Sequence, residues 1–574
     1  MALSPMPRAL AVPPRRLETR IAALTLLILA LAAGAARAAD PEVRGTWLTT
    51  TGPDHVRSGY NTESIVNQLE GARLNTLYVE AWKNGYTNYD SSILDDLIGV
   101  DRNTFLGNRD LLDETTAAAH RRGMNHVAWF EYGFASQFLG ATEGGYENPL
   151  TTHARSRGWL LEDQAGSVVN ASNPFAWMNP AVPEVRRLMI DLTLEAIKTH
   201  DLDGVQFDDR LAWPNAFGFD DTTAALYRAE TGRSLPTGPN APDDAHFKAW
   251  RQSKVTLFAR ELDAAIDRYR PDLRVSVSPS VEGFSQANFN ADWEAWSQLG
   301  LFDEFVPQVY RSSLADFQRD LPDNVEVLRD AGRLGNGVIG LRFNGGGGAT
   351  SLSDLLAMID EVRAVEGGDL AGHAMFYSEG VIDHAAALAA YYGSDADSPF
   401  YDPGHRPDPL VASNTAASTW SVTVDAAEQY RVIAEVAGLW REIDSGLFEA
   451  GSHEFDLPGA TVVELVLDRR PIEGDTDFDR DVDLDDLQAL ADAMDQPGGL
   501  MDGDFNWDGV VDDADLDLIE ATFGWNAPAA PSFEEALTLT GIAIPEPASA
   551  LLLAGLGGVL ARRRRGGTRP LRRT

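Results

Sequence analysis

The sequence predicts an α/β protein built on a (β/α)8 TIM barrel, followed by a small β-sandwich and a calcium-binding helical pair. Three observations predict this order. Eight short apolar runs alternate with helix-like stretches between residues 42 and 392. Short runs with turn residues between them fill residues 410–471, and an acidic motif occurs twice in residues 473–525. Alternating strands and helices are typical of a parallel sheet, and eight such units fit a closed barrel.

The eight predicted barrel strands are short apolar or aromatic runs with polar residues at their ends. They cover residues 45–50, 76–82, 125–134, 204–210, 274–280, 304–310, 338–344 and 373–380. Stretches between them, such as 185–200 and 247–269, carry apolar residues at helical spacing. A doubly wound open sheet is the alternative. It normally has a glycine-rich phosphate loop after its first strand, and none is present there, so we prefer the barrel.

Both ends of the chain carry targeting features. Three arginines precede an apolar run at 21–35, which the small-residue site Ala36-Arg37-Ala38 follows, so residues 1–38 are predicted to be a signal peptide. Residues 545–574 contain Pro-Glu-Pro, a short hydrophobic segment and a cluster of arginines, the pattern of a stop-transfer element. This tail resembles the PEP-CTERM sorting signal, which implies recognition by an exosortase. The protein is expected to be exported to the cell envelope, to the cell surface or outside the cell.

Composition excludes several classes of function. The chain of 574 residues has a formal net charge of −40, which disfavours nucleic acid as a partner. It contains no cysteine, so it has no disulfide, no thiolate metal site and no cysteine nucleophile.

Two linkers and a β-sandwich are predicted after the barrel, in addition to the acidic repeat and the C-terminal tail. Residues 393–409 are rich in Pro, Asp and Gly and are predicted to be a linker, and residues 410–471 to be the β-sandwich. Carbohydrate binding and simple spacing are both open for the sandwich, and spacing is favoured. Residues 526–544 are predicted to be a second linker.

The acidic repeat in residues 473–525 has the spacing of calcium loops. Oxygen-bearing side chains occupy positions 1, 3, 5, 9 and 12 of each copy, an arrangement that suits Ca²⁺. These predicted ligands are Asp475, Asp477, Asp479, Asp483 and Asp486, and then Asp504, Asn506, Asp508, Asp512 and Asp515. Each loop runs into an apolar helix.

The repeat resembles a type I dockerin, which implies a cohesin-bearing partner. A calcium-stiffened spacer is the alternative. Arg480 stands where the first loop should have glycine, so we expect a distorted turn or a weaker first site.

Paired carboxyl groups are the usual catalysts of glycosidic bond cleavage. The segment His200–Arg210 ends a predicted strand with Asp208 and Asp209. Because Val205 and Phe207 should face the helices, Asp208 should point into the barrel. We predict Asp208 as the principal catalytic carboxyl group, assisted by Asp209 or Glu131. No cofactor is expected for catalysis.

Polar and aromatic residues at the predicted strand ends favour a carbohydrate ligand, because sugars stack their apolar faces on aromatic rings. The predicted substrate-binding residues are Glu80, Trp82, Trp129, Trp177, Asn179, Arg210, Gln308, Tyr310, Arg342 and Glu379. For any single aromatic residue, packing within the barrel is an equally good interpretation. Salt bridging is an equally good one for Arg210 and Arg342.

Several ordered motifs carry a family resemblance. They are RGTWLT at 44–49, WMNP at 177–180, DGVQFDD at 203–209 and PQVY at 307–310. They resemble glycosyl hydrolase-like family 10, which implies a glycoside hydrolase of exported or envelope-associated bacterial proteins. Some relatives cleave peptidoglycan glycan strands stripped of peptides. The third strand departs from the family pattern, since Glu131 lies where typical members have Asn-Pro-Tyr after the aromatic residue, and this puts a shared substrate in doubt.

The predicted function is therefore an exported glycoside hydrolase that acts on a polysaccharide, such as an N-acetylated glycan. The alternative is a catalytically inactive glycan-binding or scaffold protein, because a barrel alone does not guarantee activity. A metal-dependent deacetylase or phosphodiesterase is disfavoured, since the sequence has no clustered histidine ligands.

Overall fold

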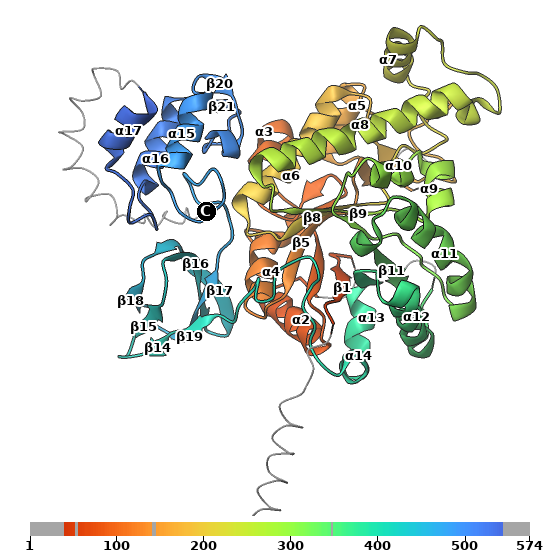
Figure 1. Cartoon of the computed structure of the whole chain (residues 1–574). Coiled ribbons are helices and arrows are strands. Elements are labelled where there is room, and N and C mark those ends of the chain that lie inside the picture. The colour runs from red at the N-terminus through yellow and green to blue at the C-terminus, as the bar shows by residue number, and fades with distance from the viewer. Residues whose placement is uncertain (1–39, 52–54, 141–144, 346–347, 543–574) are drawn as a thin grey trace, which may run out of the picture.

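The computed structural model describes residues 40–51, 55–140, 145–345 and 348–542 (Figure 1). The predicted signal peptide and sorting signal lie outside these residues. Within the described ranges, no helix combines the length and the apolar character needed to cross a membrane.

The largest part of the chain is an eight-stranded parallel sheet that curls into a barrel. Its strands are β1 (Val43–Leu48), β2 (Thr76–Glu80), β5 (Asn125–Phe130), β8 (Gly204–Asp208), β9 (Arg274–Ser278), β10 (Glu304–Phe305), β11 (Val338–Arg342) and β12 (Gly372–Phe376). Their order is β10-β9-β8-β5-β2-β1-β12-β11. Parallel bridges from Phe305 to Gly337 and from Gln308 to Gly340 join the two outer strands. Each strand overlaps one of the eight predicted runs, and the arrangement fits a TIM barrel.

Helices surround the sheet on the outside (Figure 1). Those following the strands are α2 (Gly59–Gly71), α4 (Leu111–His120), α6 (Pro183–Thr199), α8 (Ala245–Tyr269), α11 (Leu314–Asp330), α12 (Leu352–Ala364), α13 (Ser378–Asp383) and α14 (Ala385–Tyr392). Shorter additions are α3 (Ser92–Ile98), α5 (Pro149–Ser156), α7 (Asp221–Thr231), α9 (Glu282–Phe289) and α10 (Trp293–Gln298). Small strand pairs add to the loops: β3 (Trp82–Lys83) with β4 (Tyr86–Thr87), and β6 (Ala135–Phe138) with β7 (Phe175–Trp177).

Strand β8 shows how the alternation of residue types orients the site. Phe207 stacks on Phe130 and meets Phe258 of α8, so it faces the surrounding helices. Gln206 faces the barrel interior, where it accepts a 2.7 Å hydrogen bond from the Trp47 indole and donates one of 2.9 Å to Ser276. The expected division between the two faces of this strand is therefore observed.

The segment after the barrel is fastened to its underside. The Arg406 guanidinium donates to both Asp201 and Asp203, which directly precede β8, and all three side chains are buried. His120 lies 3.2 Å from Asp201 and 3.0 Å from Asp203. The predicted linker 393–409 is thus anchored through a buried ionic network.

Residues 410–471, called the β-domain below, form two antiparallel sheets. One consists of β13 (Leu410–Val411), β19 (Ala460–Leu467), β16 (Glu428–Val436) and β17 (Leu439–Phe448), and the other of β14 (Ser413–Asn414), β15 (Thr419–Val424) and β18 (Gly451–Asp456). Side chains from both sheets, including Trp420, Val432 and Val463, share one buried cluster.

The acidic repeat folds into two similar halves. The helices are α15 (Leu484–Ala493) and α16 (Asp513–Thr522), and β20 (Gln496–Pro497) pairs with β21 (Val510–Val511). The structure corrects the predicted linker 526–544, because it contains α17 (Phe533–Thr540), whose Ala536 and Leu537 are buried in the core of the repeat. Ser532 and Glu535 form a capping box that starts this helix, and this pair is a helix-start signal visible in the sequence.

Candidate functional site

Asp208 ends strand β8 at the carboxyl end of the barrel, and its side chain is almost fully buried. Its Oδ1 accepts a 3.0 Å hydrogen bond from the Arg210 backbone, and Oδ2 lies 3.4 Å from the Arg210 guanidinium. Burial and the neighbouring charges of Asp209 and Glu131 raise the pKa of Asp208 well above its usual value, although Arg210 opposes them. A carboxyl group in this position is suited to donate a proton.

Glu131 and Glu80 share the ammonium group of Lys83. Lys83 Nζ lies 2.7 Å from Glu131 Oε2 and 2.5 Å from Glu80 Oε1. Burial, reinforced by the charge of Glu80, raises the pKa of Glu131 to about 7. Burial also disfavours the charge of Glu80, but Lys83 and hydrogen bonds, including one from Thr49, lower the pKa of Glu80 to about 2. Glu80 is therefore a fixed negative charge that keeps Glu131 partly protonated near neutral pH.

The guanidinium of Arg210 is the cation shared by the carboxylates. Its Nη1 lies 3.4 to 3.8 Å from side-chain oxygens of Asp208, Asp209 and Glu131. The rings of Tyr132 and Phe175 lie within 5.1 Å of the guanidinium carbon, measured to the ring centroids. Both aromatic faces favour the cation and limit its movement. Arg210 is thus held by the acids and is part of the site. This agrees with the interpretation that Arg210 forms salt bridges.

Asp209 is the more accessible of the two adjacent acids. Its side chain is 25% exposed, whereas that of Asp208 is 5% exposed. Ser280, from the loop after β9, donates a 3.2 Å hydrogen bond to Asp209 Oδ2. Asp209 therefore offers an accessible carboxylate beside a buried acid.

Three predicted substrate-binding residues complete the mouth, Gln308 and Tyr310 after β10 and Arg342 at the end of β11. The ring of Tyr310 stacks on Phe376, and the charges of Asp208 and Asp209, together with burial, raise its pKa well above the usual value. Gln308 uses its amide nitrogen to donate to Ser278 O. Arg342, at the end of β11, donates to the Ser312 hydroxyl.

Glu379 and Trp129 lie in different surroundings. Glu379 accepts hydrogen bonds from Asn344 and from the Tyr377 hydroxyl. Trp129 lies inside the barrel against Trp47, with 6.4 Å between ring centroids.

The structure does not bring Trp82, Trp177 and Asn179 to the surface of the site. All three are buried, and each polar group already has a structural partner. The Trp82 indole donates to Gly133 O, the Trp177 indole to Asn173, and the Asn179 amide to Thr223. Position near a strand end did not distinguish these supporting residues from accessible ones. The sequence also gave no signal for Lys83, because a single lysine in a loop does not reveal that two acids will meet it.

Comparison with known proteins assigns the barrel to a family. A family model described as Glycosyl hydrolase-like 10 matches residues 42–334, which include Asp208, Asp209, Glu131 and Glu80. The chain belongs to this family. The family confirms the expected class of the barrel, that of the glycoside hydrolases.

Curated relatives and solved structures are more distant. Glycosyl hydrolase DigH of Escherichia coli (strain K12) is 23% identical over 278 residues, which are 43% of this chain and 56% of the relative. DigH of Shigella flexneri gives the same values. The chain thus spans about half the length of these curated relatives. The glycoside hydrolase domain of PgaB (BpsB) from Bordetella bronchiseptica is 13% identical, with a TM-score of 0.41, over 61% of this chain and 98% of that domain.

An aromatic strip borders the acids of this glycosyl hydrolase-like 10 barrel, and we had not predicted it. Phe175, which contacts Arg210, lies 5.2 Å from Phe138 and 6.3 Å from Trp177 between ring centroids. Trp177 in turn meets Phe289, which meets Phe284. Phe138 and Phe284 are 52% and 50% exposed. The strip is thus a row of ring contacts with a buried middle at Trp177 and an exposed phenylalanine at each end, and the sequence does not reveal that these rings meet.

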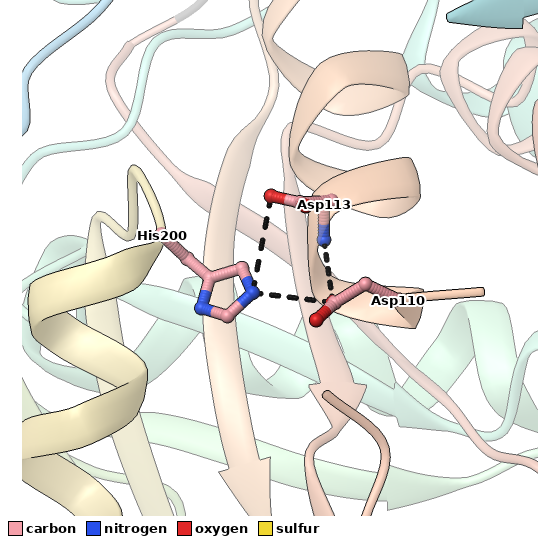
Figure 2. A group of neighbouring side chains, drawn as sticks. All are labelled: Asp110, Asp113 and His200. Atoms are coloured by element: carbon pink, nitrogen blue, oxygen red, sulfur yellow. Dashed lines mark hydrogen bonds and ion pairs between the residues drawn. The ribbon is translucent and has the colours of Figure 1, made fainter. Parts of the chain in front are cut away.

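A separate polar cluster joins α4 to the end of α6 (Figure 2). His200 Nε2 lies 3.1 Å from Asp110 and 3.8 Å from Asp113, and the three ligand-type atoms lie within 4.8 Å of one another. Although burial disfavours the charged imidazole, the hydrogen bond and charge of Asp110 raise the pKa of His200. Asp110 also caps α4 by accepting from the Asp113 backbone. The cluster is thus an ion pair between the buried His200 and the partly buried Asp110, with the exposed Asp113 beside it, and it joins two barrel helices.

The two acidic loops fold in the same way. Asp483 and Asp486 form a capping box at α15, and Asp512 and Asp515 form the matching one at α16. Carboxylate oxygens of Asp475, Asp477 and Asp479 lie within 4.8 Å of one another.

The first loop also contains an uncompensated acceptor. Asp475 is 2% exposed, and its Oδ1 is buried without a hydrogen-bond partner among the described residues. Such an oxygen fits a cation ligand.

The expected distortion by Arg480 is not observed. Arg480 has a φ of 72°, and Gly509, its counterpart in the second loop, has a φ of 90°. The backbone N–H of each residue donates to the first aspartate of its loop, Asp475 or Asp504. The turn is therefore kept with arginine in the glycine position.

Proposed function

We propose that the barrel hydrolyses a polysaccharide with Asp208 as the proton donor and Asp209 as its carboxylate partner. The observation that carries this proposal is the contrast between the two adjacent acids. Asp208 is buried with a raised pKa, and Asp209 is more exposed and accepts a hydrogen bond from Ser280. Environments that separate two neighbouring carboxyl groups in this way suit an acid and its partner in glycoside hydrolysis.

In the proposed reaction, the Asp208 carboxyl group donates its proton to the glycosidic oxygen as the bond to the anomeric carbon breaks. Asp209 supports the developing positive charge on the sugar and activates a water molecule. The hydroxyl of this water bonds to the anomeric carbon, and its proton replaces the one that Asp208 donated. Arg210 moderates the repulsion between the acids. Glu131, held by Lys83, raises the pKa of Asp208 through its charge.

The family and the aromatic strip beside the acids support a glycan as the substrate. We propose an N-acetylated glycan, with peptide-free peptidoglycan as the first candidate, met outside the cytoplasm after export through residues 1–38. Residues 545–574 would then be sorted by an exosortase. The β-domain is proposed to be a small β-sandwich that acts as a spacer.

The acidic repeat is proposed to be a dockerin-like pair that binds Ca²⁺ through its ten predicted ligands. The carboxylate donor set and the uncompensated Asp475 Oδ1 support this. Calcium titration of the mature chain tests it: Ca²⁺ should raise the melting temperature over EGTA, and an unchanged melting curve contradicts it. A cohesin-bearing partner is the dockerin-based proposal for this module.

Release of reducing ends from a glycan panel that includes peptide-free peptidoglycan tests the barrel. Asp208→Asn should lower kcat/KM by about 10²- to 10⁴-fold while circular dichroism stays unchanged. Asp330→Asn, at an exposed position on α11, is the matched control and should keep full activity. Binding of glycans by the unaltered protein without any release of reducing ends would instead support a glycan-binding scaffold.

A further inference from the structure

Both acidic loops of the repeat touch the other domains, and Asp502, which lies between the loops, pairs with Arg268 of α8. Figure 1 shows the repeat beside the barrel and above the β-domain. Loop 1 (residues 475–486) contacts the β-domain, and loop 2 (residues 504–515) contacts the ends of α6 and α8. Few interdomain contacts are expected where domains are joined only by a tether. Because the predicted calcium loops themselves make the interdomain contacts, binding of a cation in the loops is connected to the arrangement of the domains.

Loop 2 meets the barrel through Trp507 and Asp504. The Trp507 ring stacks on Tyr269, the last residue of α8, at 4.6 Å and 14°. The Tyr269 hydroxyl donates a 3.0 Å hydrogen bond to Asp504 Oδ2, the first predicted ligand of the loop. Lys198 of α6 donates 2.6 Å to Asn506 O and lies 5.5 Å from the Trp507 ring. Two ligand positions are therefore in direct contact with barrel residues.

Loop 1 meets the β-domain through the arginine that replaces glycine. The Arg480 side chain pairs with Glu428 of β16 and donates to Asp468 O. Its backbone N–H donates to Asp475. Arg480 thus joins Asp475, the first predicted ligand of the loop, to the β-domain. This contact gives the arginine at the glycine position a structural role.

Both contacts depend on backbone conformations that L-residues rarely adopt. Arg480 has a φ of 72° and Trp507 a φ of 64°. A non-glycine residue in this left-handed region is strained unless its surroundings hold it there. The hydrogen bonds from backbone N–H groups to the loop carboxylates hold these turns, and a cation that fixes those carboxylates would hold them further.

We propose that calcium in these loops docks the repeat onto the barrel and β-domain of its own chain. This inference rests on the calcium binding proposed above. The loop 2 face is then occupied within the chain, and a protein partner of the repeat has to bind elsewhere or displace it. Because linkage is reciprocal, the docking contacts also strengthen calcium binding.

The absence of cysteine allows a direct test in the full-length mature chain. Gln298→Cys on α10 and Glu520→Cys on α16, both exposed positions, would carry two spin labels. Their distance distribution by electron paramagnetic resonance should be narrow with Ca²⁺ and broad with EGTA. Calorimetric titration of the same protein with Ca²⁺ measures binding independently.

Variants at the contact separate docking from calcium binding. Trp507→Ala should broaden the distribution even with Ca²⁺ and weaken calcium binding at one site by at least about fivefold. Tyr269→Ala, which lies outside the repeat, should also broaden the distance distribution and weaken calcium binding. It tests the same contact if Trp507→Ala misfolds. Asp517→Asn, exposed on α16, is the control and should behave like the parent.

Two results would overturn the proposal in distinguishable ways. If calorimetry shows calcium binding but the distance distribution is the same in Ca²⁺ and EGTA, docking is independent of calcium and only this inference fails. If no calcium binds, the calcium proposal fails as well.

Discussion

Lys83 Nζ lies 2.7 Å from Glu131 Oε2 in the buried wall of the barrel mouth, and the same ammonium group contacts Glu80. One cation therefore compensates two acids. Because the charge of Lys83, together with hydrogen bonds, holds Glu80 ionised, the protonation state of Glu131 depends on this lysine and on Arg210. The charge balance of the site is consequently sensitive to a residue that need not contact substrate.

Lys83→Met should leave two buried carboxyl groups without their shared cation. Breaking a buried pair on one side costs about 3–5 kcal/mol of unfolding free energy, and the pKa of Glu131 should rise above about 7. We expect one limb of the pH profile of kcat/KM to move toward higher pH. Urea unfolding measures the loss of stability. Lys254→Met, which removes the partner of the more exposed Glu230, is the control and should change neither quantity appreciably. An unshifted profile in a folded Lys83→Met protein would show that Glu131 does not influence catalysis.

Glu131→Gln should make stability less dependent on pH. The pKa of Glu131 is about 7 in the folded protein, whereas the ordinary pKa of a glutamate is 4.5. The folded state therefore binds more protons between these values, and the unaltered protein should lose up to about 3 kcal/mol of stability as pH rises from 4.5 to above 7. Urea unfolding at pH 5 and pH 8.5 should show a smaller loss in the variant. Glu326→Gln, exposed on α11, should keep the original loss; the same loss in Glu131→Gln would contradict the raised pKa.

The barrel could be predicted because its signals are local. Apolar runs of strand length alternate with helical periodicity, and the alternation of Gln206 and Phe207 alone oriented β8. Contacts between loops could not be predicted in this way. Lys83 lies in β3 after β2, whereas Ser280 and Phe284 lie in the segment after β9, and only the closed sheet brings these two segments to one rim.

Burial of individual side chains was the other point at which sequence reasoning failed. Trp177 and Tyr310 both follow apolar segments, yet Trp177 is buried with its indole bonded to Asn173, and Tyr310 lies near the acids. The difference arises because Trp177 is the last residue of β7, where it pairs with Ala135 of β6 and packs against Phe175 and Phe289. Similarly, Arg480 was judged by its backbone position alone, and its side-chain partner Glu428 lies in another domain.

His200 should contribute stability that is lost at high pH. Because its folded pKa is raised, the charged pair with Asp110 is fully present below the ordinary value of 6.5 and is lost as pH rises through the folded pKa. His200→Gln should therefore cost about 1.5–3 kcal/mol at pH 6 and clearly less at pH 9, measured by urea unfolding. His246→Gln, exposed near the start of α8, provides the control. An equal cost at both pH values would mean that the imidazole acts through packing alone.

The aromatic strip should bind a long glycan and have little effect on the chemical step. Phe138 and Phe284 are about half exposed and are connected to the acids through Phe175 and Trp177. Phe138→Ala and Phe284→Ala should each raise KM for a polymer up to about tenfold, as expected for the loss of one aromatic contact worth about 0.5–1.5 kcal/mol. The value of kcat, and both constants for a short chromogenic glycoside, should stay within about twofold, since those interactions do not reach the strip. Phe105→Ala, 40% exposed in the loop before α4, is the control aromatic position. If kcat falls with the polymer while KM is unchanged, the strip acts on the transition state and the glycan is held elsewhere.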